Sequence, residues 1–139
     1  MMEIEKLLPQ RPPFLFVDKI IKAQPNMIIG EKSYNGDNIF YSTIDGKKII
    51  PSTILVESLM QCGGAGVKML DLVDGNIMAV ISIDKVIVKR MVAIPNTVIM
   101  QVENLRVHRK MLHQKGHVSL LGEAVLSAEW CCMAGKNNI

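Results

Sequence analysis

Glu57 is the side chain best suited to chemistry, because together with Gln61 it interrupts a stretch of the chain that is otherwise almost entirely apolar. Across residues 54–70 the other clearly polar side chains are Ser58 and Lys68. Apolar surroundings raise the pKa of a carboxyl group, and a nearby helix N-terminus lowers it. Glu57 is therefore a candidate for a tunable acid or base. We expect Gln61 to hydrogen-bond within the same site rather than to react.

Residues 51–70 are predicted to form one long helix. Pro51 followed by Ser52 is a helix-start signal, and Asp74-Gly75 is a matching stop signal. A helix that is apolar on almost every side is buried, and at this length we expect it at the centre of the fold rather than across a membrane. Three glycines within it each cost about 1 kcal/mol against alanine, and they indicate that another backbone packs very closely there: Gly63, Gly64 and Gly66.

Alternating apolar residues predict two strands before this helix and three or four after it. Residues 39–48 are expected to be a loop that leads into the helix. The apolar pattern changes phase after Asn104, which predicts a β-bulge, whereas the last strand is expected to run without interruption. The expected strands cover residues 15–23, 27–34, 77–84, 86–92, 97–107 and 117–133.

The predicted fold class is α+β, with one sheet wrapped around one central helix in a single domain of residues 1–139. One helix cannot cover the whole of a long sheet, so an uncovered face or edge favours dimerisation. The net charge of +3 and the 4% of aromatic residues argue against a dedicated nucleic-acid binder.

Cysteine and histidine usage predicts neither a disulfide framework nor a metal site. The three cysteines are odd in number and two of them are adjacent. Three reduced thiols, no signal peptide and no membrane-spanning run lead us to expect a cytoplasmic protein. The histidines at positions 108, 113 and 117 cluster in a basic hairpin, but no carboxylate or thiol lies close to them in sequence.

Three motifs resemble those of the β-hydroxyacyl-[acyl-carrier-protein] dehydratases, which have the hotdog fold. That family opens with Leu-Leu-Pro-His-Arg-x-Pro-Phe-Leu-x-Val-Asp, and residues 7–18 here read LLPQRPPFLFVD, with Gln10 in place of the histidine. The second family motif is Gly-His-Phe-Pro-Gly, then Pro-Gly and a helix with Glu-Ala-Met-Ala-Gln. The third is similar to IDKVIVKR at residues 83–90. The residues that match the second motif are Gly46, Pro51, Glu57 and Gln61.

The resemblance implies a catalytic pair from which one member has been lost. In the family, a histidine removes the proton α to the thioester, and a glutamate from the partner subunit helps to expel the β-hydroxyl as water. That glutamate is Glu57, but the histidine position is occupied by Thr43, which cannot be a general base at neutral pH. Asp45 is either a substitute base or an ordinary loop residue. The helix-start N–H groups of Ser52–Thr53 are retained, and they can polarise a thioester carbonyl.

The resemblance also implies partners: a second copy of the chain, and an acidic acyl carrier protein with a phosphopantetheine arm. Lys89 and Arg90 align with a Lys-Arg pair of the family, and a basic rim would steer such a carrier. No cofactor and no metal are expected. Two functions stay open: a 3-hydroxyacyl-carrier-protein dehydratase of fatty-acid or polyketide-type metabolism, or a catalytically inactive acyl- or carrier-binding subunit whose active homologue supplies the histidine. A thioesterase is a weaker alternative, because the motifs resemble those of dehydratases.

Overall fold

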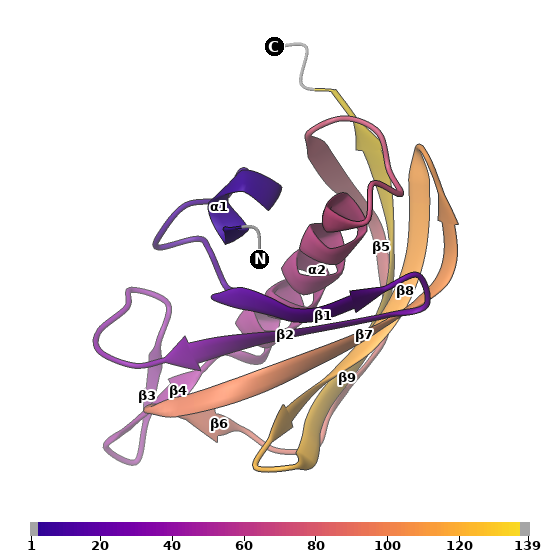
Figure 1. Cartoon of the computed structure of the whole chain (residues 1–139). Coiled ribbons are helices and arrows are strands. Elements are labelled where there is room, and N and C mark those ends of the chain that lie inside the picture. Colours follow the sequence, from indigo (N-terminus) through magenta and orange to yellow (C-terminus); the bar gives the residue numbers. More distant parts are fainter. Residues whose placement is uncertain (1–2, 137–139) are drawn as a thin grey trace.

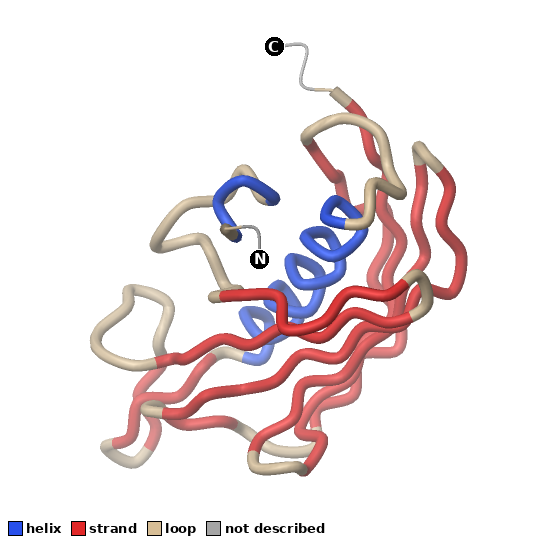
Figure 2. The backbone as a smooth tube through the Cα atoms, in the orientation of Figure 1, coloured by secondary structure: helices blue, strands red, loops and turns tan. Residues whose placement is uncertain are grey.

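The computed structural model describes residues 3–136, and its main feature is one long helix held within a curved antiparallel sheet (Figure 1, Figure 2). This helix is α2, Ser52–Met69. The predicted α+β class is confirmed. In spatial order the six strands of the sheet are β1 (Lys19–Gln24), β2 (Met27–Tyr34), β7 (Asn96–His108), β8 (Met111–Leu120), β9 (Glu123–Gly135) and β5 (Ile77–Val88).

Two smaller parts complete the described chain. A short helix, α1 (Ile4–Leu7), precedes the sheet, and a second sheet has the order β3 (Ser42–Ile44), β4 (Lys47–Ile50) and β6 (Val92–Ala93). This small sheet lies beside the N-terminal end of α2 (Figure 1). Within residues 3–136, no helix combines the length and hydropathy needed to cross a membrane.

The helix α2 lies where the sequence predicts, but both of its ends differ in detail. Pro51 is the N-cap residue, Ser52 is already helical, and no side chain caps this end. The predicted stop at Asp74-Gly75 is wrong, because the helix ends at Met69 and Leu70 is its C-cap residue. Asp71 adopts a left-handed φ of 54°. The N–H groups of Asp71 and Leu72 donate back to the last turn of the helix, to the carbonyls of Lys68 and Val67.

The three helical glycines pack against side chains, so the prediction of a close backbone neighbour is wrong. Absence of a Cβ leaves room for long side chains that reach the helix from the sheet. The groups that a Cβ would meet are Gln114 at Gly63, Met78 at Gly64 and Ile28 at Gly66.

Residues 39–48, predicted to be a loop, contain the hairpin of β3 and β4 instead. Ile44 and Lys47 pair across a two-residue turn. The turn residues Asp45 and Gly46 have φ angles of 50° and 76°, as a type I′ hairpin turn requires. Asp-Gly is a strong sequence signal for this turn, although the flanking strands are too short and too exposed to show clear alternation.

The predicted strand of residues 117–133 is two strands, β8 and β9, joined by a tight turn at Leu121-Gly122. A two-residue turn shifts the buried positions from even to odd numbers. A register shift opposite Val118 and Ser119 then shifts them back, since Val118 pairs with Leu126 but Ser119 pairs with Ala124. The even-numbered pattern therefore continues across the turn and conceals it.

The segment after α2 also differs from its prediction. The two strands expected at residues 77–84 and 86–92 form one strand, β5, at the edge of the sheet. It continues past an irregularity between Asp84 and Ile87, where Lys85 has a φ of 54°. Most of its apolar side chains are exposed. The β-bulge predicted at Asn104 is confirmed by a register shift between Asn104 and Arg106.

Candidate active site

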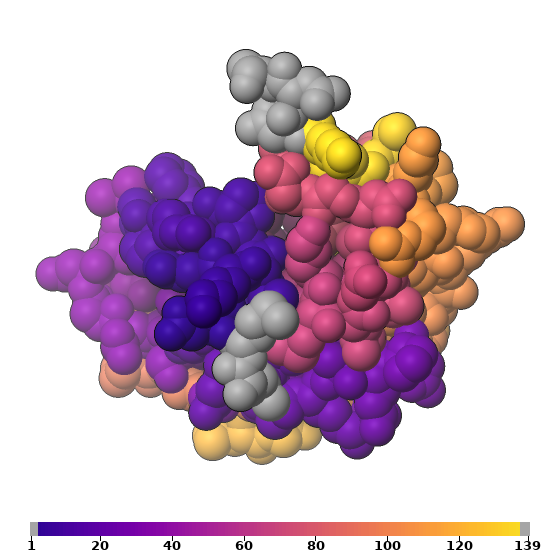
Figure 3. Space-filling view, turned by 45° about the horizontal axis from the view of Figure 1, so that its top comes forward, coloured from indigo at the N-terminus to yellow at the C-terminus, as the bar shows by residue number. Residues whose placement is uncertain are grey.

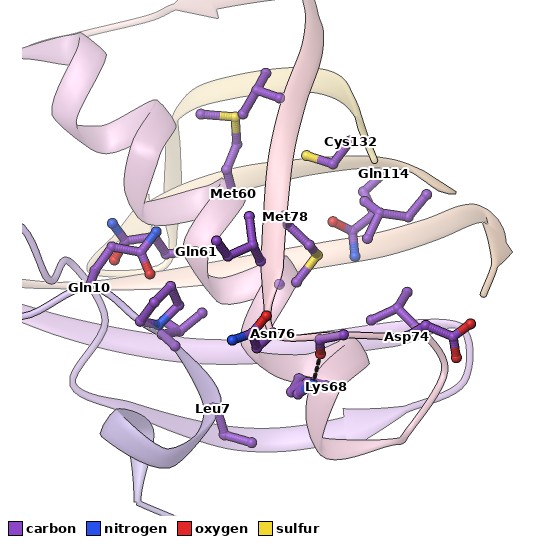
Figure 4. Close-up of a pocket in the computed structure, with 18 of the residues that line it drawn as sticks. Leu7, Gln10, Met60, Gln61, Lys68, Asp74, Asn76, Met78, Gln114 and Cys132 are labelled. Atoms are coloured by element: carbon purple, nitrogen blue, oxygen red, sulfur yellow. Dashed lines mark hydrogen bonds between the residues drawn. The ribbon is translucent and has the colours of Figure 1, made fainter. Parts of the chain in front are cut away.

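A cavity of about 210 Å³ runs along one face of α2. From the helix it is lined by Glu57, Gln61, Gly64 and Lys68, whose spacing of three or four residues places them on one face. The other walls come from residues 7–10, from β5 with the segment before it, and from Leu112, Gln114 and Cys132 on β8 and β9. The N-terminal segment lies beside the surface of residues near 60–80 (Figure 3), and Figure 4 shows the side chains that line the cavity.

Glu57 is half-buried in the wall of this cavity. Burial raises the pKa of its carboxyl group, and a hydrogen bond from Gln61 partly offsets this effect. The bond runs from Gln61 Nε2 to Glu57 Oε1 over 3.4 Å. A carboxyl group with a raised pKa that faces a partly apolar cavity can deliver a proton to a leaving hydroxyl group.

Gln61 also holds the segment that follows the N-terminal wall of the cavity. Its Oε1 accepts a hydrogen bond from the backbone N–H of Phe16 at 2.8 Å, and its Nε2 donates to the carbonyl of Phe14 at 3.0 Å. The predicted first strand therefore begins only at Lys19, because the backbone around Phe14 and Phe16 bonds to a helix side chain instead of to the sheet.

The residues at the lost histidine position lie on the small sheet. Thr43 is exposed on β3 and pairs in register with Lys48. Asp45 and Gly46 form the turn of that hairpin and are exposed as well. None of these three residues, all within the described range, lines the cavity that contains Glu57. The fold of one chain therefore brings together Glu57 and Gln61 but not Thr43.

The N–H groups of Ser52 and Thr53 lie at the N-terminal turn of α2, and neither residue lines the cavity. The intrahelical bonds of α2 begin with the N–H groups of Ile54 and Leu55, which both bond to the carbonyl of Pro51. The N–H groups of Ser52 and Thr53 precede them, in the turn where helix donors have no partner within the helix. These donors carry the positive end of the helix dipole, so they can polarise a carbonyl oxygen.

Lys89 and Arg90 are exposed directly after β5. Their backbone N–H groups both donate to the carbonyl of Val125, at 2.8 and 3.3 Å. The Arg90 guanidinium lies 3.5 Å from the Glu123 carboxylate, and both side chains are largely solvated. Such an exposed pair contributes little to stability.

Sequence reasoning missed Gln114, which is fully buried between the sheet and the helix and lines the same cavity. The alternation of the strand does indicate its burial, because Gln114 is at an even-numbered position on the same face as the buried Leu112 and Val118. Gln114 falls between the predicted strands of residues 97–107 and 117–133, whereas β8 begins at Met111.

The histidines do not form a cross-strand pair. His108 pairs in register with Met111, whereas His117 pairs with Gln101. His113 bonds to the carboxylate of Glu129 at 2.8 Å. Over residues 3–136, no group of three or more histidine, cysteine, aspartate or glutamate side chains is arranged to hold a metal ion.

The raised pKa of Glu57 predicts that the wild type loses stability relative to Glu57→Gln as the pH rises. A carboxyl group whose pKa is higher in the folded than in the unfolded state binds its proton more tightly when folded. Its stabilising contribution is complete below the ordinary pKa of 4.5 and is lost as the pH rises through the folded-state value. Urea unfolding of both proteins between pH 4 and pH 8 measures this difference. A constant difference in the free energy of unfolding, or one that favours the wild type at higher pH, would contradict the prediction.

Comparison with known proteins places this architecture in one family. A FabA-like domain matches residues 8–129. The 3-hydroxyacyl-[acyl-carrier-protein] dehydratase FabZ of Enterococcus faecalis is 27% identical over 135 residues, which cover 96% of both chains. FabZ of Anaeromyxobacter sp. is 29% identical and covers 94% of this chain and 86% of its own. The bifunctional enzyme LpxC/FabZ of Porphyromonas gingivalis is 44% identical over 62 residues, which are 44% of this chain and 13% of that protein.

Solved structures agree on the fold. The dehydratase heterocomplex ApeI:P of Xenorhabdus doucetiae contains a chain with a TM-score of 0.84 and 15% identity, covering 99% of this chain and 93% of its own. The protein PH1136 of Pyrococcus horikoshii has a TM-score of 0.70 and 12% identity, over 97% and 95% of the two chains. With the long helix inside its sheet and the FabA-like match over most of its length, this chain belongs to the β-hydroxyacyl-[acyl-carrier-protein] dehydratase family.

Proposed function

We propose that this protein binds 3-hydroxyacyl thioesters presented by an acyl carrier protein and supplies Glu57 as the acid half of a dehydratase site. The observation that carries this proposal is the half-buried Glu57, with its raised pKa, in the wall of a 210 Å³ cavity. An acyl chain occupies the cavity, and the N–H groups of Ser52 and Thr53 polarise the thioester carbonyl. Glu57 protonates the 3-hydroxyl group as it leaves as water, while a base from a second chain, either Asp45 of another copy or the histidine of a related chain, takes the α proton and the C–H electron pair becomes the new double bond.

The site needs two chains, because the base position and Glu57 lie on different parts of one chain. Thr43 is exposed on β3 of the small sheet, whereas Glu57 faces the cavity on α2. A second chain paired along the free edge of β5 would bring its own small sheet to this cavity. Lys89 and Arg90 directly follow that edge strand and would attract the acidic carrier to the shared site.

The outer edge of β5 is the surface that we assign to the second copy. It has apolar side chains that are 43–55% exposed: Val80, Ile81, Ile83, Val86, Ile87 and Val88. An edge strand also has unpaired backbone groups, and a matching strand can satisfy them. When two identical edges pair about a two-fold axis, each edge is used up by the other, so the product is a closed dimer.

Ile81→Lys is expected to convert a dimer into a monomer. Ile81 is 51% exposed on the edge strand, so a lysine there is tolerated in the single chain but places two charges in an apolar seam. Light scattering after size-exclusion chromatography should give twice the monomer mass for the wild type and the monomer mass for the variant. Leu121→Lys, at the 91% exposed turn between β8 and β9, is the matched control and should stay dimeric. A monomeric wild type would show that the outer edge of β5 does not bind a second copy of the chain.

The absence of a base at Thr43 favours a second candidate function, a non-catalytic subunit of a heteromer. A related hotdog chain would then supply the histidine that faces Glu57 of this chain. Among the structural neighbours, the one with a TM-score of 0.84 is a dehydratase heterocomplex. A turnover assay with a 3-hydroxyacyl thioester, followed by the absorbance of the enoyl product, separates the two candidates. Activity of the purified chain supports the first, and thioester binding without turnover supports the second.

A further inference from the structure

Three glutamines line the cavity beside Glu57, and two of them are fully engaged by the protein. Gln61 uses both amide atoms to hold the backbone of Phe14 and Phe16. Gln114 accepts a hydrogen bond from the Trp130 indole and donates to the Gly63 carbonyl. These two glutamines therefore have structural partners that account for their burial.

The side-chain oxygen of the third glutamine, Gln10, is an unpaired hydrogen-bond acceptor. Its Oε1 is buried and has no hydrogen-bond partner in the protein, and among residues 3–136 it is the one buried side-chain nitrogen or oxygen in this condition. Gln10 and Gln61 lie on the same side of the cavity in Figure 4, with Asp74 on the far side. Burial of an unsatisfied acceptor is costly, so the folded chain gains nothing from this oxygen unless a donor reaches it.

We propose that Gln10 is a ligand-recognition residue whose Oε1 accepts a hydrogen bond from an N–H or O–H group of the bound thioester. This inference rests on the proposed function. A 3-hydroxyacyl thioester of pantetheine offers two sources of such a donor: the 3-hydroxyl group near Glu57, and the amide N–H groups of the pantetheine arm. A plain alkyl chain has no N–H or O–H donor, so the unpaired Oε1 of Gln10 selects against a ligand that is only an alkyl chain.

Gln10→Leu removes the acceptor and keeps a similar side-chain volume. Its affinity is measured by calorimetry for 3-hydroxyoctanoyl-pantetheine, octanoyl-pantetheine, and the S-ethyl thioesters of 3-hydroxyoctanoic and octanoic acid. We expect a loss of roughly five- to tenfold for ligands that carry the recognised donor, and no loss for S-ethyl octanethioate. A loss limited to the two hydroxy ligands identifies the 3-hydroxyl group, and a loss limited to the two pantetheine ligands identifies the amides.

Thermal unfolding without ligand separates recognition from a structural role. Because Gln10→Leu deletes an unsatisfied buried acceptor, its Tm should equal or exceed that of the wild type, whereas a structural glutamine would lower the Tm when replaced. Gln24→Leu, on the exposed end of β1, is the matched control and should leave every affinity unchanged. Unchanged affinities in Gln10→Leu, or an equal loss for all four ligands, would overturn the role of Gln10 alone. A wild type that binds none of the four ligands would overturn the proposed function together with this role.

Discussion

Thr43→His is expected to raise the rate of 3-hydroxyacyl thioester dehydration at least about a hundredfold over the wild type. General-base catalysis by a positioned histidine contributes roughly 10²- to 10⁴-fold, and the threonine hydroxyl cannot remove a proton at neutral pH. Thr43 is exposed on a short hairpin, so the larger side chain has room and the fold is retained. The measurement is the appearance of enoyl absorbance with purified protein and a 3-hydroxyacyl thioester.

The gain should depend on Glu57. In the double variant Thr43→His/Glu57→Gln the rate should return to that of the wild type, because glutamine cannot donate a proton to the leaving hydroxyl group. Asp45→Asn is the control for a substitute base: Asp45 lies in the turn at a φ of 50°, which asparagine tolerates well. A wild type that turns over and is silenced by Asp45→Asn would show that Asp45 has replaced the histidine.

Two other outcomes would contradict the proposed arrangement. If Thr43→His gains rate and keeps it in the Glu57→Gln background, Glu57 is not the acid. If wild type and Thr43→His are both silent and neither binds the thioester, the acyl-thioester function fails and only the fold remains. Binding by both proteins without turnover in either would favour the heteromeric subunit.

The sequence predicts the centre of this molecule better than its edges. The apolar run of α2 has a strong signal, since few other structures can bury so many consecutive apolar residues, and the helix lies within one residue of its expected bounds. The β3–β4 hairpin was missed because its strands are short and exposed. The β8–β9 turn was missed because a compensating register shift restores the alternation.

Sequence identifies the site residues one by one, whereas their arrangement depends on folding and assembly. Glu57 is visible as a carboxylate in an apolar helix, and Gln61 as its neighbour one turn later. The engagement of Gln61 with Phe14 and Phe16 depends on contacts 45 and 47 residues apart in sequence, which no local pattern encodes. The relation of Thr43 to Glu57 depends on a second chain, which no pattern within one sequence encodes.

Gln114 is the side chain whose loss should cost the fold most among the polar residues of the core. It is fully buried and connects four parts of the fold through three hydrogen bonds. Its Oε1 accepts from Trp130 Nε1 at 3.0 Å, and its Nε2 donates to Asn104 Oδ1 at 2.7 Å and to the Gly63 carbonyl at 3.3 Å. Asn104 in turn donates to the carbonyl of Pro25 in the β1–β2 turn at 2.9 Å.

Gln114→Leu is therefore expected to lower the free energy of unfolding by about 2–4 kcal/mol, since it leaves the Trp130 indole N–H and the Asn104 amide oxygen without their buried partner. For a chain of this size the loss corresponds to a decrease in Tm of roughly 10 °C, measured by calorimetry and by urea unfolding. Gln101→Leu on β7, a partly buried glutamine that lines a groove on the sheet, is the matched control and should change stability by less than about 1 kcal/mol.

A double-mutant cycle with Trp130→Phe tests whether the hydrogen bond itself is responsible. Gln114→Leu leaves the indole N–H of Trp130 as an unpaired buried donor, and Trp130→Phe removes that donor. The Trp130→Phe substitution should then cost about 0.5–3 kcal/mol less in the Gln114→Leu background than in the wild type. Strictly additive costs would show that Gln114 stabilises the fold through packing alone, and a Gln114→Leu protein as stable as the wild type would show that the buried network can be replaced by apolar contacts without loss.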